Sequence, residues 1–199
     1  GVGKTLNDYL DEWNPDSLRY ALASILPEQN DSEISEDEMI RRNNEELVAA
    51  WGNLVQRVFS QYINNFENLK FDFELNDVDR KIIDEANVCF EKTSELIEKV
   101  ELKSSLQSVM GYVNKINAYL NETEPWKVIK EDITRGTAIL YTSLTAIEAC
   151  ASLFTPFMPT TSEIVKNAIE KNTNNNWSVN DIKKGAPLQD IGHLFKKFD

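Results

Sequence analysis

Glycine and proline are scarce in this chain, with seven and six among its 199 residues, roughly half of their usual share. Sheet-rich folds need turn residues about every 8–12 positions, so the shortage favours an all-α fold. Cys89 and Cys150 are the only thiols and His193 is the only imidazole, which excludes a zinc finger and a disulfide scaffold. We expect both cysteines to be buried and unreactive, and His193 to lie in a surface loop.

Basic residues are outnumbered by acidic ones, 21 to 33, which gives a net charge of −12. A surface of that sign repels nucleic acid at long range, so composition alone argues against RNA. The most apolar stretch, 138–158, carries Glu148 at its middle and five Thr or Ser residues. A membrane span tolerates such residues poorly, so this stretch is predicted to be a buried helix. We expect a cytoplasmic protein with no membrane partner.

Apolar residues recur at helical spacing along most of the chain, which predicts a series of amphipathic helices. Ser35 and Glu38 form a capping-box pattern before a long helix that ends near Asn65, and Asn76 caps the next helix. The other predicted helices start at Pro15 and stop before Pro27, run over 102–120, run from Pro125 to Pro156, and run over 161–170. The sum is an antiparallel helical bundle.

Breaks and close contacts are also predicted. Residues 121–124 interrupt the helices, and 172–176 and 185–187 are loops. Gly136 sits on an apolar stripe, where the missing side chain lets a neighbouring helix approach closely. Leu194 and Phe195 form an apolar anchor that docks back onto the bundle.

No catalytic constellation emerges from the sequence. Gly1 to Thr5 look like part of a phosphate-binding loop, but that motif needs another Gly about five residues earlier and a strand before it. The chain begins too late for either, and we expect it to be cut from something longer. The carboxylates fall on helix exteriors and in loops, and no acid cluster has metal spacing. We therefore predict no catalytic and no metal-binding residue in this chain.

Two features suit a binding site. The apolar stripe of the long helix is formed by Leu47, Trp51, Leu54, Val55, Val58 and Tyr62. At about 100° per residue, Asn53 and Arg57 point away from it as an i,i+4 pair, with planar groups that suit base edges. Pro125-Trp126 opens a helix, where the ring is either core or a platform on which a base stacks. Taken alone, the Asn/Arg pair is more often solvated surface, and the Trp is more often a core or half-core side chain.

Several segments resemble methionyl-tRNA synthetases. Residues 119–127 (YLNETEPWK) look like the stretch around their Pro-Trp signature, and Gly52-Asn53-x-x-x-Arg57 is similar in order and spacing to the archaeal type that some bacteria also carry. Residues 156–159 (PFMP) resemble a turn shared by the class I enzymes for Met, Val, Ile and Leu. Residues 14–20 (NPDSLRY) resemble the helix after the catalytic KMSKS loop. The segment 32–39 departs from relatives, which carry aromatic residues there.

The resemblance implies a class I methionine–tRNA ligase without its catalytic domain. It implies that Asn53, Arg57, Pro125 and Trp126 belong to the surface that reads the CAU anticodon of methionine tRNA, with Trp126 stacked on the first base. ATP and Mg²⁺ belong to the missing catalytic domain, which is the other implied partner. The fragment alone holds no cofactor and is expected to be inactive, and no DNA is expected as partner.

The resemblance also divides the chain. Residues 1–30 are expected to form a stem-contact linker, 31–175 the helical anticodon-binding domain, and 176–199 a C-terminal return segment. Two other interpretations remain open. One is a helical interaction module without an RNA role, in which Trp126 is buried. The other is the equivalent domain of a valine, isoleucine, leucine or cysteine enzyme.

Overall fold

The structure is a computed structural model that describes residues 5–26 and 35–199. Its elements are α1 (Leu6–Glu12), α2 (Pro15–Ile25), α3 (Glu36–Arg42), the π-helix η1 (Asn43–Gly52), α4 (Asn53–Asn65), the 3₁₀ turn η2 (Phe66–Asn68), α5 (Asp77–Glu98), α6 (Leu102–Thr123), α7 (Pro125–Glu131), α8 (Ile133–Phe154) and α9 (Pro159–Ala168). Across those two ranges the β-structure amounts to one isolated bridge between Lys171 and Ile182. The predicted all-α fold is confirmed.

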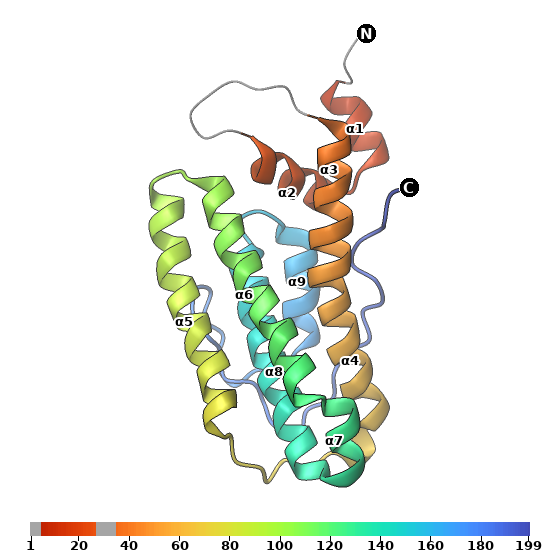
Figure 1. Cartoon of the computed structure of the whole chain (residues 1–199), viewed down its shortest axis with the longest axis vertical. Coiled ribbons are helices and arrows are strands. Elements are labelled where there is room, and N and C mark those ends of the chain that lie inside the picture. Colours follow the sequence, from red (N-terminus) through yellow and green to blue (C-terminus); the bar gives the residue numbers. More distant parts are fainter. Residues whose placement is uncertain (1–4, 27–34) are drawn as a thin grey trace.

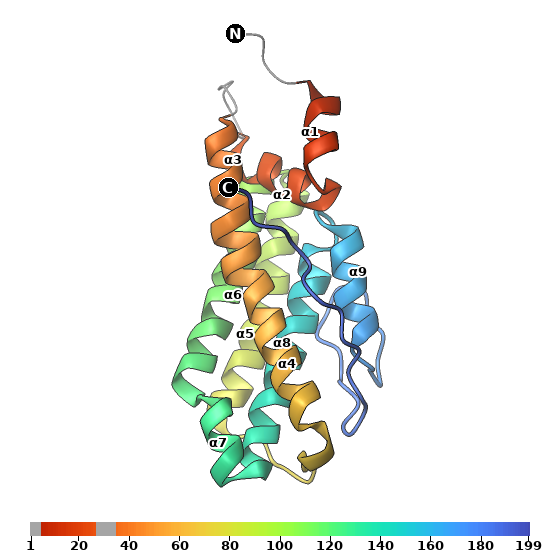
Figure 2. The same ribbon diagram turned by 90° about the vertical axis from the view of Figure 1, so that its right-hand side faces the viewer.

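The helices form an elongated bundle (Figure 1). Helices α5, α6 and α8 run along its long axis beside the continuous rod of α3, η1 and α4. Helices α1 and α2 cover one end and α7 covers the other. After α9 the chain returns along the face between α4 and α9, and its C-terminal end lies beside α3 (Figure 2).

Helix α8 is the core of the bundle and is buried along nearly its whole length. It is long and apolar enough to cross a membrane, yet its most apolar window is 100% buried among the other helices. Its hydroxyls bond to carbonyls one turn earlier, as Thr142 Oγ1 does to Ala138 O at 2.8 Å and Ser143 Oγ to Ile139 O at 2.7 Å. The buried Glu148 accepts a bond from Asn180 Nδ2 at 2.9 Å. The prediction of a buried helix is confirmed.

The predicted break at 121–124 is wrong. Helix α6 continues to Thr123, and the chain turns at the single residue Glu124, whose φ of 46° lies in the left-handed region. The single helix predicted from Pro125 to Pro156 is also wrong, because Asp132 (φ −141°, ψ 89°) separates α7 from α8 and its carboxylate caps α8 by accepting from Arg135 N at 3.1 Å. The last helix spans Pro159–Ala168 rather than 161–170.

The long helix predicted up to Asn65 is present but irregular, because its ten central residues are π-helical. Gly52 belongs to this segment, and a Cβ there would lie 2.8 Å from Leu47 O. The capping box at Ser35 is half formed: Ser35 Oγ accepts from Glu38 N at 3.3 Å, while the Glu38 carboxylate binds Arg41 and Arg42 instead.

The C-terminal segment (residues 176–199) begins against α5, where Trp177 Nε1 donates to Ser94 Oγ, and its last residues pack along the rod (Figure 2). Leu194 and Phe195 contact the main core cluster, which confirms the predicted anchor. Asn44 Nδ2 donates to Phe198 O at 2.7 Å, and the Phe198 ring lies 4.4 Å from that of Trp13.

The two cysteines and the single histidine lie where the sequence predicts them. Cys89 and Cys150 are free and buried, and His193 is exposed in a loop, all as predicted. Residues 1–4, and with them most of the phosphate-loop-like start, lie outside the described residues, as do residues 32–34 of the atypical segment 32–39.

Candidate nucleic-acid interface

Helix α4 presents Asn53 and Arg57 on its outer face. Leu54, Val55 and Val58 face the core and are buried, whereas Asn53 and Arg57 are exposed. The two polar side chains are one turn apart. Their outward orientation agrees with the prediction, even though the preceding ten residues are π-helical, because regular α-helical spacing resumes at Asn53.

The turn between α6 and α7 determines where Trp126 lies. Glu124 takes the left-handed conformation, and Pro125 follows as the first residue of α7, a position that suits its fixed φ. Pro125 is buried, and Trp126 is half-buried. The indole is therefore neither a core side chain nor a freely solvated one.

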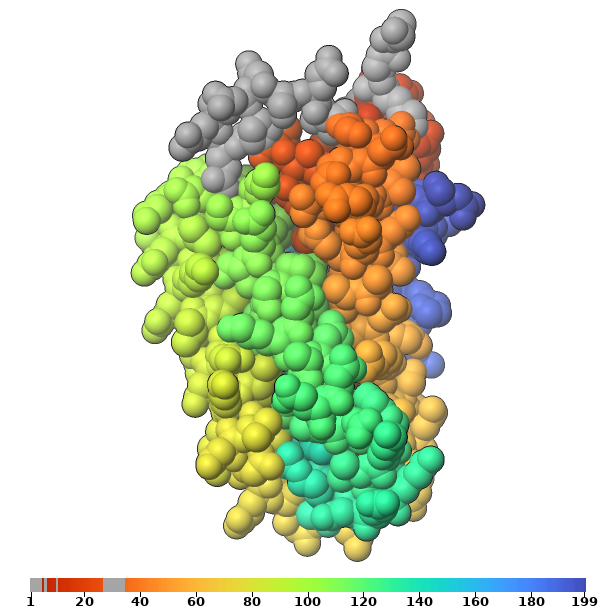
Figure 3. Space-filling view, in the orientation of Figure 1, coloured from red at the N-terminus to blue at the C-terminus, as the bar shows by residue number. Residues whose placement is uncertain are grey.

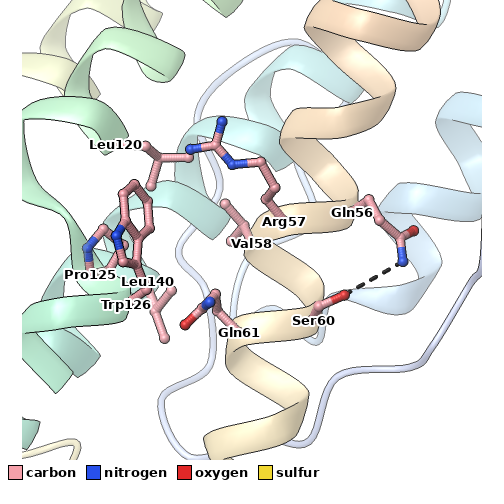
Figure 4. Close-up of a pocket in the computed structure, with 9 residues that line it drawn as sticks. All are labelled: Gln56, Arg57, Val58, Ser60, Gln61, Leu120, Pro125, Trp126 and Leu140. Atoms are coloured by element: carbon pink, nitrogen blue, oxygen red, sulfur yellow. Dashed lines mark hydrogen bonds between the residues drawn. The ribbon is translucent and has the colours of Figure 1, made fainter. Parts of the chain in front are cut away.

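A pocket of about 260 Å³ lies between α4 and α7 (Figure 4). Arg57 and Trp126 face each other across it, with the guanidinium carbon 5.5 Å from the centre of the ring. Its lining residues are Gln56, Arg57, Val58, Ser60, Gln61, Leu120, Pro125, Trp126 and Leu140. In the space-filling view the surfaces of α7 and α4 meet at this end of the molecule (Figure 3). The structure thus brings Arg57 close to Pro125 and Trp126, which follow it by 68 and 69 positions in the sequence. Asn53 lies one helical turn from Arg57 and does not line the pocket.

Sequence reasoning missed the polar residues on the same face of α4. Gln61 follows Arg57 by one helical turn and lines the pocket, and Gln56 Nε2 approaches Ser60 Oγ at 3.5 Å. The i,i+4 spacing that linked Asn53 to Arg57 extends to Gln61, so the signal was present in the sequence.

The chemistry of the pocket suits a planar, partly polar ligand. Val58, Leu120 and Leu140 supply apolar surface, Trp126 supplies an aromatic face, and Arg57 and Gln61 supply planar hydrogen-bonding groups. Nucleobases bind to such sites by stacking and by bonds to their edges. Among the described residues, no group of three or more His, Cys, Asp or Glu side chains could hold a metal ion.

Comparisons with known structures show the same fold in a synthetase. The chain superimposes on apo Mycobacterium tuberculosis methionyl-tRNA synthetase with a TM-score of 0.84 and 22% identity, covering 92% of this chain and 39% of that one. The complex of that enzyme with methionyl-adenylate superimposes with a TM-score of 0.81 and 22% identity, covering 90% of this chain and 37% of that one.

Curated relatives agree with this. The methionine–tRNA ligase of Corynebacterium glutamicum is 34% identical over 198 residues, which is 96% of this chain and 32% of the relative. The methionine–tRNA ligase of Chloroflexus aggregans is 38% identical over 163 residues, which is 82% of this chain and 27% of the relative. The chain therefore spans about a third of the length of these relatives.

Residues 1–59 match the family of class I tRNA synthetases for methionine, and the solved synthetase above contains the same helical fold. Residues 72–199 match the anticodon binding domain of methionyl tRNA ligase. The chain belongs to the methionyl-tRNA ligase family.

Proposed function

We propose that this chain is the part of a methionine–tRNA ligase that recognises the CAU anticodon of methionine tRNA. The observation that carries the proposal is the half-buried Trp126, held at a helix start and facing Arg57 across an apolar pocket. The alternative of a helical interaction module without an RNA role, in which Trp126 is buried, is not favoured, because residues 72–199 match the anticodon binding domain of methionyl tRNA ligase.

Each site residue has a distinct role in this proposal. The Trp126 ring stacks on the first anticodon base, and Pro125 fixes the backbone that carries the ring. Arg57 and Asn53 donate hydrogen bonds to base edges. The Arg57 guanidinium lies over the Trp126 ring, so the incoming base takes its place on that face and Arg57 turns to the base edge.

The acidic net charge is compatible with this role. Backbone-driven binding needs a basic surface, but anticodon loops are read through splayed bases, stacking and a few hydrogen bonds. The acidic surface then limits non-specific RNA binding. We expect a shallower salt dependence than that of proteins which neutralise many phosphates.

The parent protein is proposed to attach methionine to tRNA with ATP and Mg²⁺ in a catalytic domain that precedes this chain. Within the chain we propose a stem-contact linker at 1–30, the anticodon-binding domain at 31–175 and a return segment at 176–199. The cell compartment proposed is the cytoplasm. The isolated chain should show no ATP–pyrophosphate exchange.

A binding experiment tests the proposal. The 199-residue chain is titrated with a labelled anticodon stem-loop that carries CAU, and with a matched stem-loop in which the first base is G. We expect CAU to bind at least fivefold more tightly, since one base contact discriminates by ~1–3 kcal/mol. Equal affinities for the two RNAs would refute the proposal.

Arg57→Ala should affect binding much more than stability. The guanidinium is exposed, and its cation–π contact with Trp126 at 5.5 Å is worth only about 0.5–1 kcal/mol at such a site. We therefore expect a small loss in free energy of unfolding, and at least a fivefold loss of affinity for the CAU stem-loop. Arg41→Ala is the matched control, because Arg41 is an exposed arginine in α3 of the same rod, far from the pocket. An Arg57→Ala variant that is strongly destabilised yet binds normally would make Arg57 structural.

A further inference from the structure

Helix α7, which carries Trp126, cannot fix its own position. It has seven residues, and isolated helices of that length are not stable in water. The left-handed Glu124 and the extended Asp132 bound it on either side. The position of the indole therefore depends on the contacts that α7 and these two junctions make with the rest of the bundle.

The first such contact is the close packing of α7 against Gly136 of α8. A Cβ at Gly136 would lie 2.8 Å from Ile129 Cα and 3.0 Å from Ile129 Cβ. Real Cβ atoms do not approach a backbone atom that closely, so any side chain at Gly136 moves α7 away from α8. Ile129 is three residues from Trp126, one helical turn along the same short helix.

The second contact is a partly buried ion pair next to Gly136, in which the Arg135 side chain is 26% exposed and that of Asp79 is fully buried. Arg135 donates to Asp79 through Nη1 at 2.6 Å and Nη2 at 2.9 Å. The fully buried Asp79 also accepts from the Tyr119 hydroxyl at 2.5 Å and from Asn76 N at 3.0 Å. Tyr119 precedes the turn into α7 by five residues, and Arg135 follows α7 by four. One carboxylate of α5 thus ties together the helix that enters α7 and the helix that leaves it.

The charge state of Asp79 fits this role. Burial by itself raises the pKa of the Asp79 carboxyl, but the bonds from Arg135, Tyr119 and Asn76 outweigh burial and hold that pKa below its ordinary value. The carboxylate is therefore ionised at neutral pH and binds the Arg135 guanidinium as a bidentate ion pair.

We propose that Gly136 and Arg135 are positioning residues for Trp126. Neither residue lines the pocket. Gly136 acts by letting α7 pack directly on α8, and Arg135 acts by tying the start of α8 to Asp79 of α5, which also binds Tyr119 near the end of α6. Recognition sites lose affinity when the supporting contacts let a side chain shift by about 1 Å. The effect on RNA binding rests on the function proposed above, whereas the effect on the indole does not.

Fluorine resonances test the position of the indole without RNA. The chain is labelled with 5-fluorotryptophan, and the resonance of Trp126 among the four tryptophans is assigned with Trp126→Phe. We expect Gly136→Ala to shift the Trp126 resonance and to leave that of Trp51 in place. Gly111→Ala is the control, because an added Cβ there meets nothing within 4 Å. It should shift neither resonance.

Binding of the CAU stem-loop gives the second readout. Gly136→Ala should weaken binding at least fivefold and Gly111→Ala should not. Arg135→Gln should likewise shift the Trp126 resonance and weaken binding, and it leaves Asp79 with its bonds from Tyr119 and Asn76. Arg80→Gln is its control, because Arg80 follows Asp79 in the sequence but is exposed and pairs with Asp77. The change removes a positive charge, as Arg135→Gln does, and leaves the Arg135–Asp79 pair in place.

The outcomes separate this inference from the proposed function. If Gly136→Ala and Arg135→Gln leave the Trp126 resonance unmoved, the inference is wrong, whatever the RNA does. If they shift it while the unmodified chain binds both stem-loops equally, the positioning role stands and the proposed function fails. If the Gly136→Ala chain does not fold, Arg135→Gln alone decides.

Discussion

Trp126→Ala is expected to weaken binding of the CAU stem-loop by roughly five- to hundredfold. Removing an aromatic side chain on which a base stacks costs ~1–3 kcal/mol, and each 1.4 kcal/mol is about tenfold in affinity. The half-buried ring contributes little to folding, so the free energy of unfolding should fall by only about 1 kcal/mol. Equilibrium titration and denaturant unfolding of the same preparation measure the two quantities.

The same change in the parent enzyme should separate two reactions. We expect kcat/KM for methionine tRNA to fall by the same factor, because binding of the anticodon is lost. Formation of methionyl-adenylate, which we assign to the other domain, should be unchanged. Trp126→Phe is the conservative variant, and it should recover most of the affinity because it keeps an aromatic face. A Trp126→Ala chain that folds and binds CAU as the unmodified chain does would exclude the stacking role.

Local rules in the sequence were sufficient for the start of α5 and for the outward face of α4. The Asn76 cap, with Asp79 as its reciprocal partner, is present at the start of α5, and the apolar stripe placed Asn53 and Arg57 on the solvent side. The close approach at Gly136 was also predictable, because a glycine on an otherwise apolar stripe indicates a near neighbour. That neighbour is α7.

The geometry of the pocket was not predictable in the same way. The one-residue turn at Glu124 and the break at Asp132 replace a predicted four-residue break and a continuous helix. Pro125 is a local signal that the helix ends before it, but the sequence gives no strong local signal for a left-handed conformation at Glu124, which is uncommon for a residue other than glycine. Arg57 lies on α4 and Trp126 on α7, so it is tertiary packing that brings the two side chains to face each other.

Trp51→Ala should have the opposite profile from Trp126→Ala. Trp51 is 1% exposed and its ring centre lies 5.2 Å from that of Phe154 in the core helix α8. Truncating a buried Trp or Phe to Ala costs ~3–5 kcal/mol through lost contacts and the cavity left behind. Because domains are stable by only ~5–15 kcal/mol, a large share of the stability of this chain should be lost, with a large fall in the denaturant midpoint.

Affinity for RNA separates the two tryptophans. Trp51 lies two residues before Asn53 in sequence but points into the bundle, so folded Trp51→Ala chains should bind the CAU stem-loop as the unmodified chain does once the unfolded fraction is subtracted. The comparison is made at low temperature and without denaturant, where the folded fraction is largest. If Trp51→Ala keeps its stability and loses RNA affinity, the indole that contacts RNA is on η1 rather than α7, and the site lies on a different face from the one assigned to it.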